Sequence, residues 1–284
     1  MVDAVNSQAV LVQIGNEGDD PDTVNSVVTA AQLGQILPVL RGIAAGNQTA
    51  HQDYIDANPN SFSSPATAAE VQAMVDAVNV AQLRYCKGSP TAVVDVVGAG
   101  GATWMDRNLG ATRVATSSTD AESYGYLYQW GRFADGHQCR TSGTTEIIAT
   151  TAVANGGNAW DGLFIEGSSD WLSTQDDTLW DGVSGTNNPC PSGYRLPTET
   201  ELDTERLSWG SSNAAGAFAS PLKLPVAGSR SYTNGNVTYT GVYGYYWSST
   251  VDGIRARYFN FNSSFAGIYS SVRVYGYSVR CLKD

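Results

Sequence analysis

The sequence has few of the side chains on which most catalytic and nucleic-acid-binding sites depend. Only 16 of its 284 residues are lysine or arginine, against 27 acidic residues, and the formal net charge is −11. Phosphate recognition needs a basic surface, so nucleic acid is excluded as a partner. The two histidines, His51 and His137, belong to no H-E-x-x-H motif, and there is no G-x-S-x-G elbow. We therefore expect that the protein is not an enzyme, that it has no catalytic residue and that it binds no cofactor.

Long apolar runs and closely spaced cysteines are also absent. No run approaches the length that spans a bilayer, so we expect no membrane insertion by this segment. The four cysteines form no C-x-x-C pair and no Cys/His cluster, which argues against a bound metal. Two disulfides in an oxidising compartment are the better interpretation. No signal peptide opens the chain, and we expect an export signal or anchor upstream.

A repeated hexapeptide divides the first part of the chain. Met1–Asn6 recurs unchanged as Met74–Asn79. We interpret residues 1–22 as the tail of a preceding repeat with its linker. Residues 23–85 would then be the next repeat, a small all-α bundle that acts as a spacer.

Helix starts are marked inside this repeat. Thr29 with Gln32 and Thr67 with Glu70 match the capping box, and an apolar stripe at helical spacing follows each. Pro38 is expected to break or kink the first of these helices. A third helix is predicted from Asn47 to about residue 57.

The composition changes after residue 90. Hydrophobic residues are 42 % of the chain, with 30 glycines, 15 tyrosines and 7 tryptophans, which is typical of a loop-rich fold with short strands. A strand is predicted over 92–97, followed by a glycine turn over 98–102. A capping box at Thr198 predicts a helix to about Trp209. Asn234-Gly235 predicts a two-residue hairpin turn.

Five ordered stretches between residue 90 and the end of the sequence carry a family resemblance. They are Thr103–Ala111, Tyr126–Arg132, Asn188–Thr198, Tyr245–Thr250 and Gly276–Asp284. Together they resemble the Fibrobacter succinogenes major paralogous domain of bacterial surface proteins. They are also similar to formylglycine-generating-type domains and to variable proteins of diversity-generating retroelements. The resemblance implies an α+β chain with a C-type-lectin-like domain over 86–284, carrying long structured loops.

The resemblance also implies how the cysteines pair. Cys190 and Cys281 fall in two of the matched stretches and are expected to form one disulfide, with Cys86 and Cys139 as the other. The calcium-dependent sugar-binding tripeptides of animal lectins are missing, and so are the paired catalytic cysteines of formylglycine-generating enzymes. Neither a carbohydrate role nor an oxidase is therefore supported.

In the proteins that diversity-generating retroelements target, the coding sequence of a terminal segment is replaced by a reverse-transcribed copy, and the reverse transcription misreads adenines in its template. Asn codons of the AAC type then give Tyr, Ser, Phe, Ile, Val, Asp, Gly or Arg, but never Lys, Glu, Gln, Met or Trp. Those five types are absent from 251–277. Tyr, Ser, Gly, Asn and Arg are the residues that antibody-like binding surfaces collect. We expect a variable segment over about 242–284.

Within this segment we distinguish exposed ligand-binding positions from scaffold positions. The expected ligand-binding residues are Asp252, Ile254, Arg255, Arg257, Tyr258, Phe265, Gly267, Ile268, Tyr269, Ser270, Ser271, Val272, Val274, Tyr275 and Tyr277. The expected scaffold residues are Trp247, Ala256, Phe259, Phe261, Arg273, Val279 and Cys281. Strand alternation places Phe259 and Phe261 on an inward face, with Tyr258 opposite.

The sequence therefore favours an extracellular, cell-surface or phage-borne protein whose diversified segment binds an unknown protein or surface ligand. Three alternatives stay open. In the first, the tyrosine-rich tract is the last sheet of an ordinary domain. In the second, the chain is a fixed-sequence adhesive or structural surface domain. In the third, it is a relative of the formylglycine-generating enzymes. Oligomeric state is not indicated.

Overall fold

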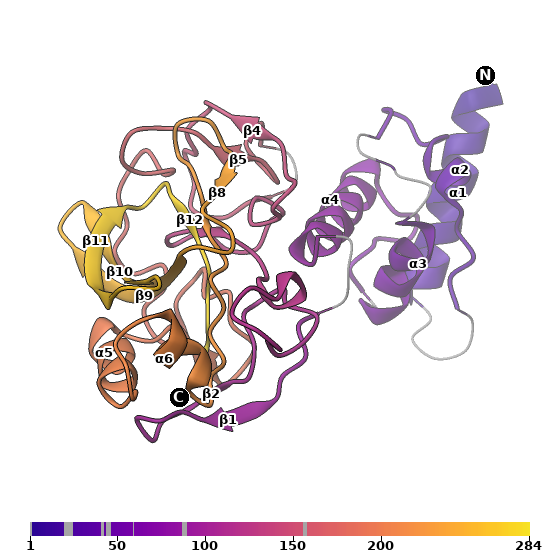
Figure 1. Cartoon of the computed structure of the whole chain (residues 1–284). Coiled ribbons are helices and arrows are strands. Elements are labelled where there is room, and N and C mark those ends of the chain that lie inside the picture. The colour runs from indigo at the N-terminus through magenta and orange to yellow at the C-terminus, as the bar shows by residue number, and fades with distance from the viewer. Residues whose placement is uncertain are drawn as a thin grey trace. The chain divides into compact units, whose positions relative to one another are not determined.

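The computed structural model describes residues 2–19, 25–40, 43, 47–58, 60–86, 90–155 and 158–284. The chain divides into two units, one spanning Met1–Gln82 and the other comprising Leu83–Ala154 and Asn158–Asp284. The first unit is helical, and the second combines short helices with mostly antiparallel sheets (Figure 1). The predicted α+β class is confirmed.

The helical unit contains four helices among its described residues. They are α1 (Val2–Asp19), α2 (Ala30–Leu33), α3 (Gln48–Ala57) and α4 (Ala68–Arg84). Both predicted capping boxes are present, since Thr29 and Gln32 exchange side-chain-to-backbone hydrogen bonds, as do Thr67 and Glu70. Helix α2 ends at Leu33, one turn after it begins, so Pro38 is not what stops it.

Helix α1 shares one core with the helices that follow it. Val10, Leu11 and Ile14 are buried in the same cluster as residues of α3 and α4. A Cβ at Gly15 would lie 2.6 Å from the Ser63 carbonyl oxygen, so this position needs glycine for close approach of the two backbones. The predicted separation of residues 1–22 from 23–85 therefore does not describe the packing, because α1 is part of the helical unit.

The second unit is built from short strands in four sheets. The sheet orders are β1-β2-β13-β6, β11-β10-β9, β3-β12-β7-β8 and a parallel β4-β5 pair. The strands are β1 (Asp95–Val97), β2 (Thr103–Met105), β3 (Tyr128–Gln129), β4 (Thr144–Thr145), β5 (Phe164–Ile165), β6 (Tyr194–Arg195), β7 (Ser229–Arg230), β8 (Val237–Thr238), β9 (Gly244–Asp252), β10 (Arg255–Phe261), β11 (Ala266–Val272), β12 (Gly276–Tyr277) and β13 (Leu282–Lys283). The last strand, β13, lies between β2 and β6, so the end of the chain is part of the fold.

Local predictions in this unit hold in part. The predicted strand over 92–97 is shorter, and the glycine turn after it joins β1 to β2. The helix predicted from Thr198 is α5 (Glu199–Leu207), and α6 (Ala214–Ala219) follows. Strands β7 and β8 pair as a hairpin, but residues 231–236 connect them instead of a two-residue turn. The Ser231 N–H donates to the Asn236 carbonyl at 2.9 Å and closes this longer loop, and Arg230 Nε donates to the Gly235 carbonyl at 2.8 Å.

The sheet β9-β10-β11 has different partners on its two faces. Phe259 and Phe261 are buried on one face, in a cluster with residues of α5 and α6 (Figure 1). Trp247 and Ala256 belong to a cluster on the other face, with Tyr258 at its edge. The predicted alternation of Phe259 and Phe261 against Tyr258 is confirmed.

Two disulfides close the loops of the second unit. Cys190 pairs with Cys281 and Cys86 with Cys139, as predicted, with Cα separations of 5.9 and 5.6 Å. The first bond joins residues 91 positions apart, which ties the end of the chain to the middle of the unit. A bond that closes a loop of this length stabilises the folded state by roughly 4–5 kcal/mol in the chain-entropy picture.

Candidate functional site

Aromatic rings gather on the face of β9-β10-β11 that lies opposite the two phenylalanines, and on the neighbouring loops. Each ring lies within 6.5 Å, centroid to centroid, of another ring of the set. The rings belong to Tyr232, Tyr239, Tyr243, Tyr245, Trp247, Tyr258, Phe265, Tyr269, Tyr275 and Tyr277. We call this set the aromatic surface.

Strand register places the middle of the aromatic surface. Tyr258 on β10 lies opposite Trp247 on β9 and opposite Tyr269 on β11. Because residues directly across an antiparallel pair point to the same face, the three rings form one row across the sheet. A bulge in the β9-β10 pairing, between Ala256 and Tyr258, adjusts the register next to this row.

The aromatic surface has a buried floor and an exposed rim. Trp247 and Tyr277 form the floor, with ring centroids 4.4 Å apart. The Trp247 indole donates to the Tyr128 carbonyl oxygen at 2.7 Å, which fixes its orientation. At the rim, Tyr269 is 45 % and Tyr239 is 58 % exposed. The exposed rim rings therefore rest on floor rings that are buried and fixed in orientation.

Four phenols of the aromatic surface have a raised pKa and stay uncharged at physiological pH. Burial raises the pKa of Tyr245, and neighbouring phenols add to the rise. Burial likewise raises the pKa of Tyr258, Tyr275 and Tyr277. The hydroxyls can donate or accept hydrogen bonds, so the surface offers apolar area together with neutral polar atoms.

The tip of the β9-β10 hairpin carries polar and charged side chains. Ser270 donates to the Asp252 carboxylate, and Arg257 Nε lies 3.3 Å from a Glu199 carboxylate oxygen. Ile254 and Arg255 are exposed at the same tip. Arg257 is next to Tyr258 in the strand and points to the opposite face. The charged side chains thus lie beside the aromatic surface and not within it.

The structure divides the fifteen expected ligand-binding residues by exposure. Exposed residues are Asp252, Ile254, Arg255 and Tyr269. Partly buried residues are Arg257, Tyr258, Phe265, Gly267, Ile268, Ser270, Val272 and Tyr275. Buried residues are Ser271, Val274 and Tyr277. All seven expected scaffold residues are buried.

The expected exposure of Ser271, Val274 and Tyr277 is wrong. Val274 belongs to a core cluster with Trp171 and other residues of the long loops. The hydroxyls of Ser271 and Tyr277 lie 3.1 Å apart, within hydrogen-bonding distance, beneath the sheet. Tyr277 lies on β12, which pairs with β3 and β7 in another sheet, and period-two alternation could not reveal such long-range pairing.

The expected set is also spread over two faces. Ile268 lies opposite Phe259 in the β10-β11 register and so belongs to the face that packs on α5. Conversely, sequence reasoning missed Tyr232, Tyr239 and Tyr243 and treated Tyr245 only as part of a motif. The dense tyrosines of residues 239–246 were an available signal.

The buried Arg273 contacts the tip of the β9-β10 hairpin. Its side chain is 1 % exposed, and its guanidinium lies 4.4 Å from the centroid of Trp130. The Nη2 atom is 2.5 Å from Asp177 and donates to the Gly253 carbonyl at 3.1 Å. One arginine therefore links the loop around residue 177 to the turn between β9 and β10.

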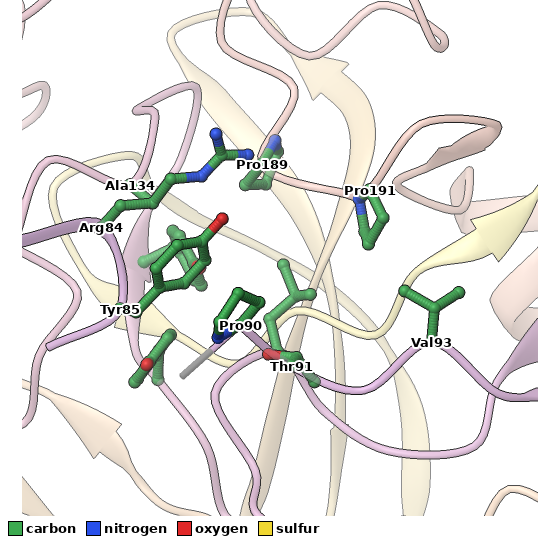
Figure 2. A pocket seen from close by; sticks show the side chains of 11 residues that line it. Arg84, Tyr85, Pro90, Thr91, Val93, Ala134, Pro189 and Pro191 are labelled. Atoms are coloured by element: carbon green, nitrogen blue, oxygen red, sulfur yellow. The ribbon is translucent and has the colours of Figure 1, made fainter. Parts of the chain in front are cut away.

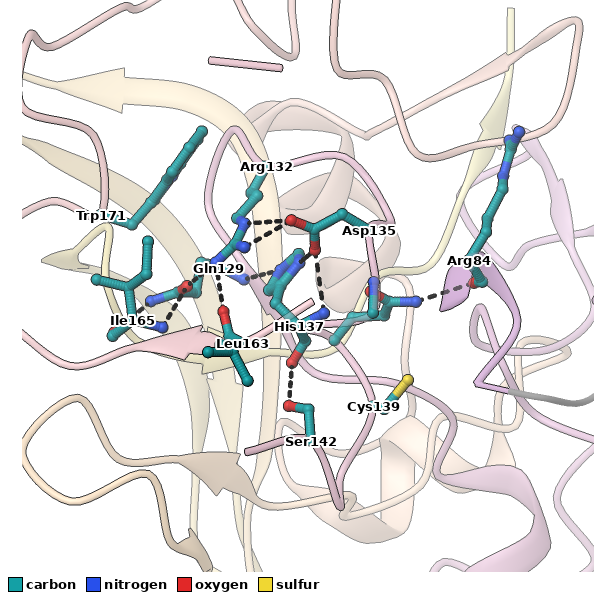
Figure 3. Close-up of polar contacts among 12 residues, drawn as sticks. Arg84, Gln129, Arg132, Asp135, His137, Cys139, Ser142, Leu163, Ile165 and Trp171 are labelled. Atoms are coloured by element: carbon teal, nitrogen blue, oxygen red, sulfur yellow. Dashed lines mark hydrogen bonds and ion pairs between the residues drawn. The ribbon is translucent and has the colours of Figure 1, made fainter. Parts of the chain in front are cut away.

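The only histidine of the second unit is part of a buried network. Figure 3 shows Asp135 between Arg132 and His137, with contacts of 2.5 Å to Arg132 Nη2 and 2.6 Å to His137 Nδ1. The backbone N–H of Gln129 donates to His137 Nε2 at 3.1 Å. Burial and the nearby Arg132 charge lower the pKa of His137 to about 4. Burial alone would raise the pKa of Asp135, but the nearby Arg132 and His137 outweigh burial and hold the pKa of this carboxyl well below its usual value. With no open side, the network is structural.

A small pocket of about 130 Å³ lies elsewhere in the second unit. Figure 2 shows Arg84, Tyr85 and Pro90 near Pro189 and Pro191 at its edge. It has room for one small side chain of a partner. Its walls carry no paired acid and base.

Two structural findings bear on other kinds of site. Within the described ranges, no three His, Cys, Asp or Glu side chains are placed to hold a metal ion together. None of the described helices combines the length and the apolar character needed to cross a bilayer.

Comparison with known proteins gives one match. A family model described as a domain of unknown function (DUF8237) matches residues 216–282. No curated protein and no solved structure matches the chain. The matched region contains β7 to β12 and every ring of the aromatic surface, so the chain is similar to that family where the candidate site lies.

Proposed function

We propose that this protein binds a protein or surface ligand through the aromatic surface. In this proposal residues 86–284 form a C-type-lectin-like domain, and about residues 242–284 are diversified by adenine-directed mutagenesis from a retroelement. The protein acts outside the cell or on a cell or phage surface. Its two disulfides support a non-reducing location.

One observation carries the proposal: the tyrosines are held in place by groups that do not themselves face outward. The floor rings are fixed by hydrogen bonds, and the hairpin tip is fixed by Arg273. A tyrosine on a rigid support loses little side-chain entropy on binding and offers a large amphipathic contact. Such rings are the usual centres of binding energy in protein interfaces.

Sequence change at the rim is expected to leave the fold intact. Exposed positions such as Ile254, Arg255 and Tyr269 make few buried contacts, so their replacement costs little stability. The core under them is supplied by Trp247, Phe259 and other buried residues. This separation between frame and rim is what a diversified binding protein needs.

A library experiment tests the proposal. The randomised positions are Asp252, Ile254, Arg255, Phe265, Tyr269 and Tyr275. Three of these positions belong to the aromatic surface and three lie at the hairpin tip beside it, so the control library randomises exposed positions in neither region, which are Ile147, Ile148, Val183 and Leu207. Both libraries are displayed on phage, treated with protease, and selected on immobilised lysozyme and on streptavidin.

We expect most members of the first library to survive protease and to yield specific binders to each target. The control library is expected to survive as well but to yield none. Loss of protease resistance in most members of the first library, or equal binder yields from both, would refute the proposal. Diversification itself is tested in the neighbouring DNA, where a reverse-transcriptase gene and a near-copy of the terminal coding segment differing only at adenines are expected. Their absence favours a fixed-sequence adhesive domain.

A further inference from the structure

Helix α1 has two apolar faces, and only one of them is covered. Val10, Leu11 and Ile14 lie in the core of the helical unit. On the other side, Val5 is 68 % and Val12 is 40 % exposed. Val5, Ala9 and Val12 are spaced by four and three residues, so they form one stripe along the helix. We call these three residues the outer stripe.

The beginning of this stripe has an identical counterpart inside a core. The hexapeptide Met1–Asn6, whose residues from Val2 onward begin α1, has the same sequence as Met74–Asn79 in α4. In α4 the hexapeptide buries Met74, Val75 and Val78, the last at 4 % exposure. Val5 is the counterpart of Val78. Within the repeated hexapeptide, the valine that is core in α4 at position 78 is therefore exposed in α1 at position 5.

The core around α4 shows what such a face packs with. Its buried cluster includes Leu33 of α2, Ile36 after that helix, Ile55 of α3, and Phe62. All four residues come from the segment 25–66. Val5 has the same hexapeptide sequence and helical geometry around it as Val78, and Ala9 and Val12 continue its side of α1, so this side suits a segment of the same kind.

We propose that the outer stripe of α1 is the docking face for a further copy of the helical segment 25–66. Helix α1 is then shared, as the closing helix of one helical unit and the opening helix of the next. A complete second molecule does not supply this partner, because its own α4 already covers its segment 25–66. The helical units thus stack as repeats, each completing its neighbour's core.

The experiment uses the full chain and an extended chain in which residues 25–73 are placed directly before Met1. Residue 73 precedes Met74 in the natural sequence, so the junction with Met1 continues the helix in the same register as in α4. Side-chain burial is measured as the rate at which a thiol-specific reagent labels Val5→Cys without reductant. Ala4→Cys is the matched control, because its counterpart Ala77 is exposed in α4.

We expect the extension to slow labelling of Val5→Cys at least tenfold, while Ala4→Cys reacts at the same rate in both chains. Equal rates for Val5→Cys in the two chains would overturn the proposal. So would equal slowing at both positions, which indicates unspecific collapse. Circular dichroism covers the remaining case: an extension that adds no helical signal has not folded against α1 and also refutes the proposal.

Discussion

Acidification is expected to destabilise the second unit through His137. In the folded state burial and Arg132 lower the pKa of His137 to about 4, whereas an exposed histidine titrates near 6.5. Below pH 6.5 the unfolded chain therefore binds a proton that the folded chain does not. Stability then rises with pH in this window, because the unfolded state holds more protons. The two values give a loss of about 2 kcal/mol between pH 7.5 and pH 5.0.

The assay is urea denaturation followed by tryptophan fluorescence, with the disulfides intact. All seven tryptophans lie after residue 103, so the signal reports on the second unit and not on the helical unit with His51. The control is His137→Asn, whose side-chain amide can still donate to Asp135. We expect this variant to be less stable at pH 7.5 but to lose little further stability down to pH 5.0. An equal pH dependence in both proteins would refute the assignment to His137.

Three further outcomes follow from the packing. Tyr258→Ala should cost about 2–3 kcal/mol by urea denaturation, because its ring packs on buried Trp247 and Tyr277, whereas Tyr269→Ala should cost less than about 1 kcal/mol; equal losses would contradict the difference in burial between Tyr258 and the rim residue Tyr269. Arg273→Ala should cost about 3 kcal/mol and increase protease cleavage at the β9-β10 turn, and unchanged cleavage would argue against its role as the link. Replacing Cys190 and Cys281 by serine should lower the unfolding free energy by roughly 4–5 kcal/mol, with the loss abolished when both proteins are compared under reductant.

Short-range features could be predicted because their partners lie within a few residues. The capping boxes at Thr29 and Thr198 need only a side chain and the backbone three residues away. Alternation along β10 likewise separates Phe259 from Tyr258 without knowledge of other elements. The hairpin loop was mispredicted because the strands end with a hydrogen bond from the Ser231 N–H to the Asn236 carbonyl, which closes a longer loop than Asn234-Gly235 alone indicates.

The sequence by itself indicated the tract over 251–277, rich in tyrosine and free of lysine and glutamate, that carries half of the rings of the aromatic surface, and the family resemblance implied how the cysteines pair. The tertiary structure alone decided which of those residues reach solvent. Tyr269 and Tyr277 belong to the same tyrosine-rich tract, yet one is at the rim and the other at the floor, because Tyr277 lies on β12, which pairs with β3 and β7 in another sheet. It also brought in Tyr239 and Tyr243 from an earlier loop. Exposure depends on contacts between residues far apart in the chain, and composition or periodicity contains no information about those contacts.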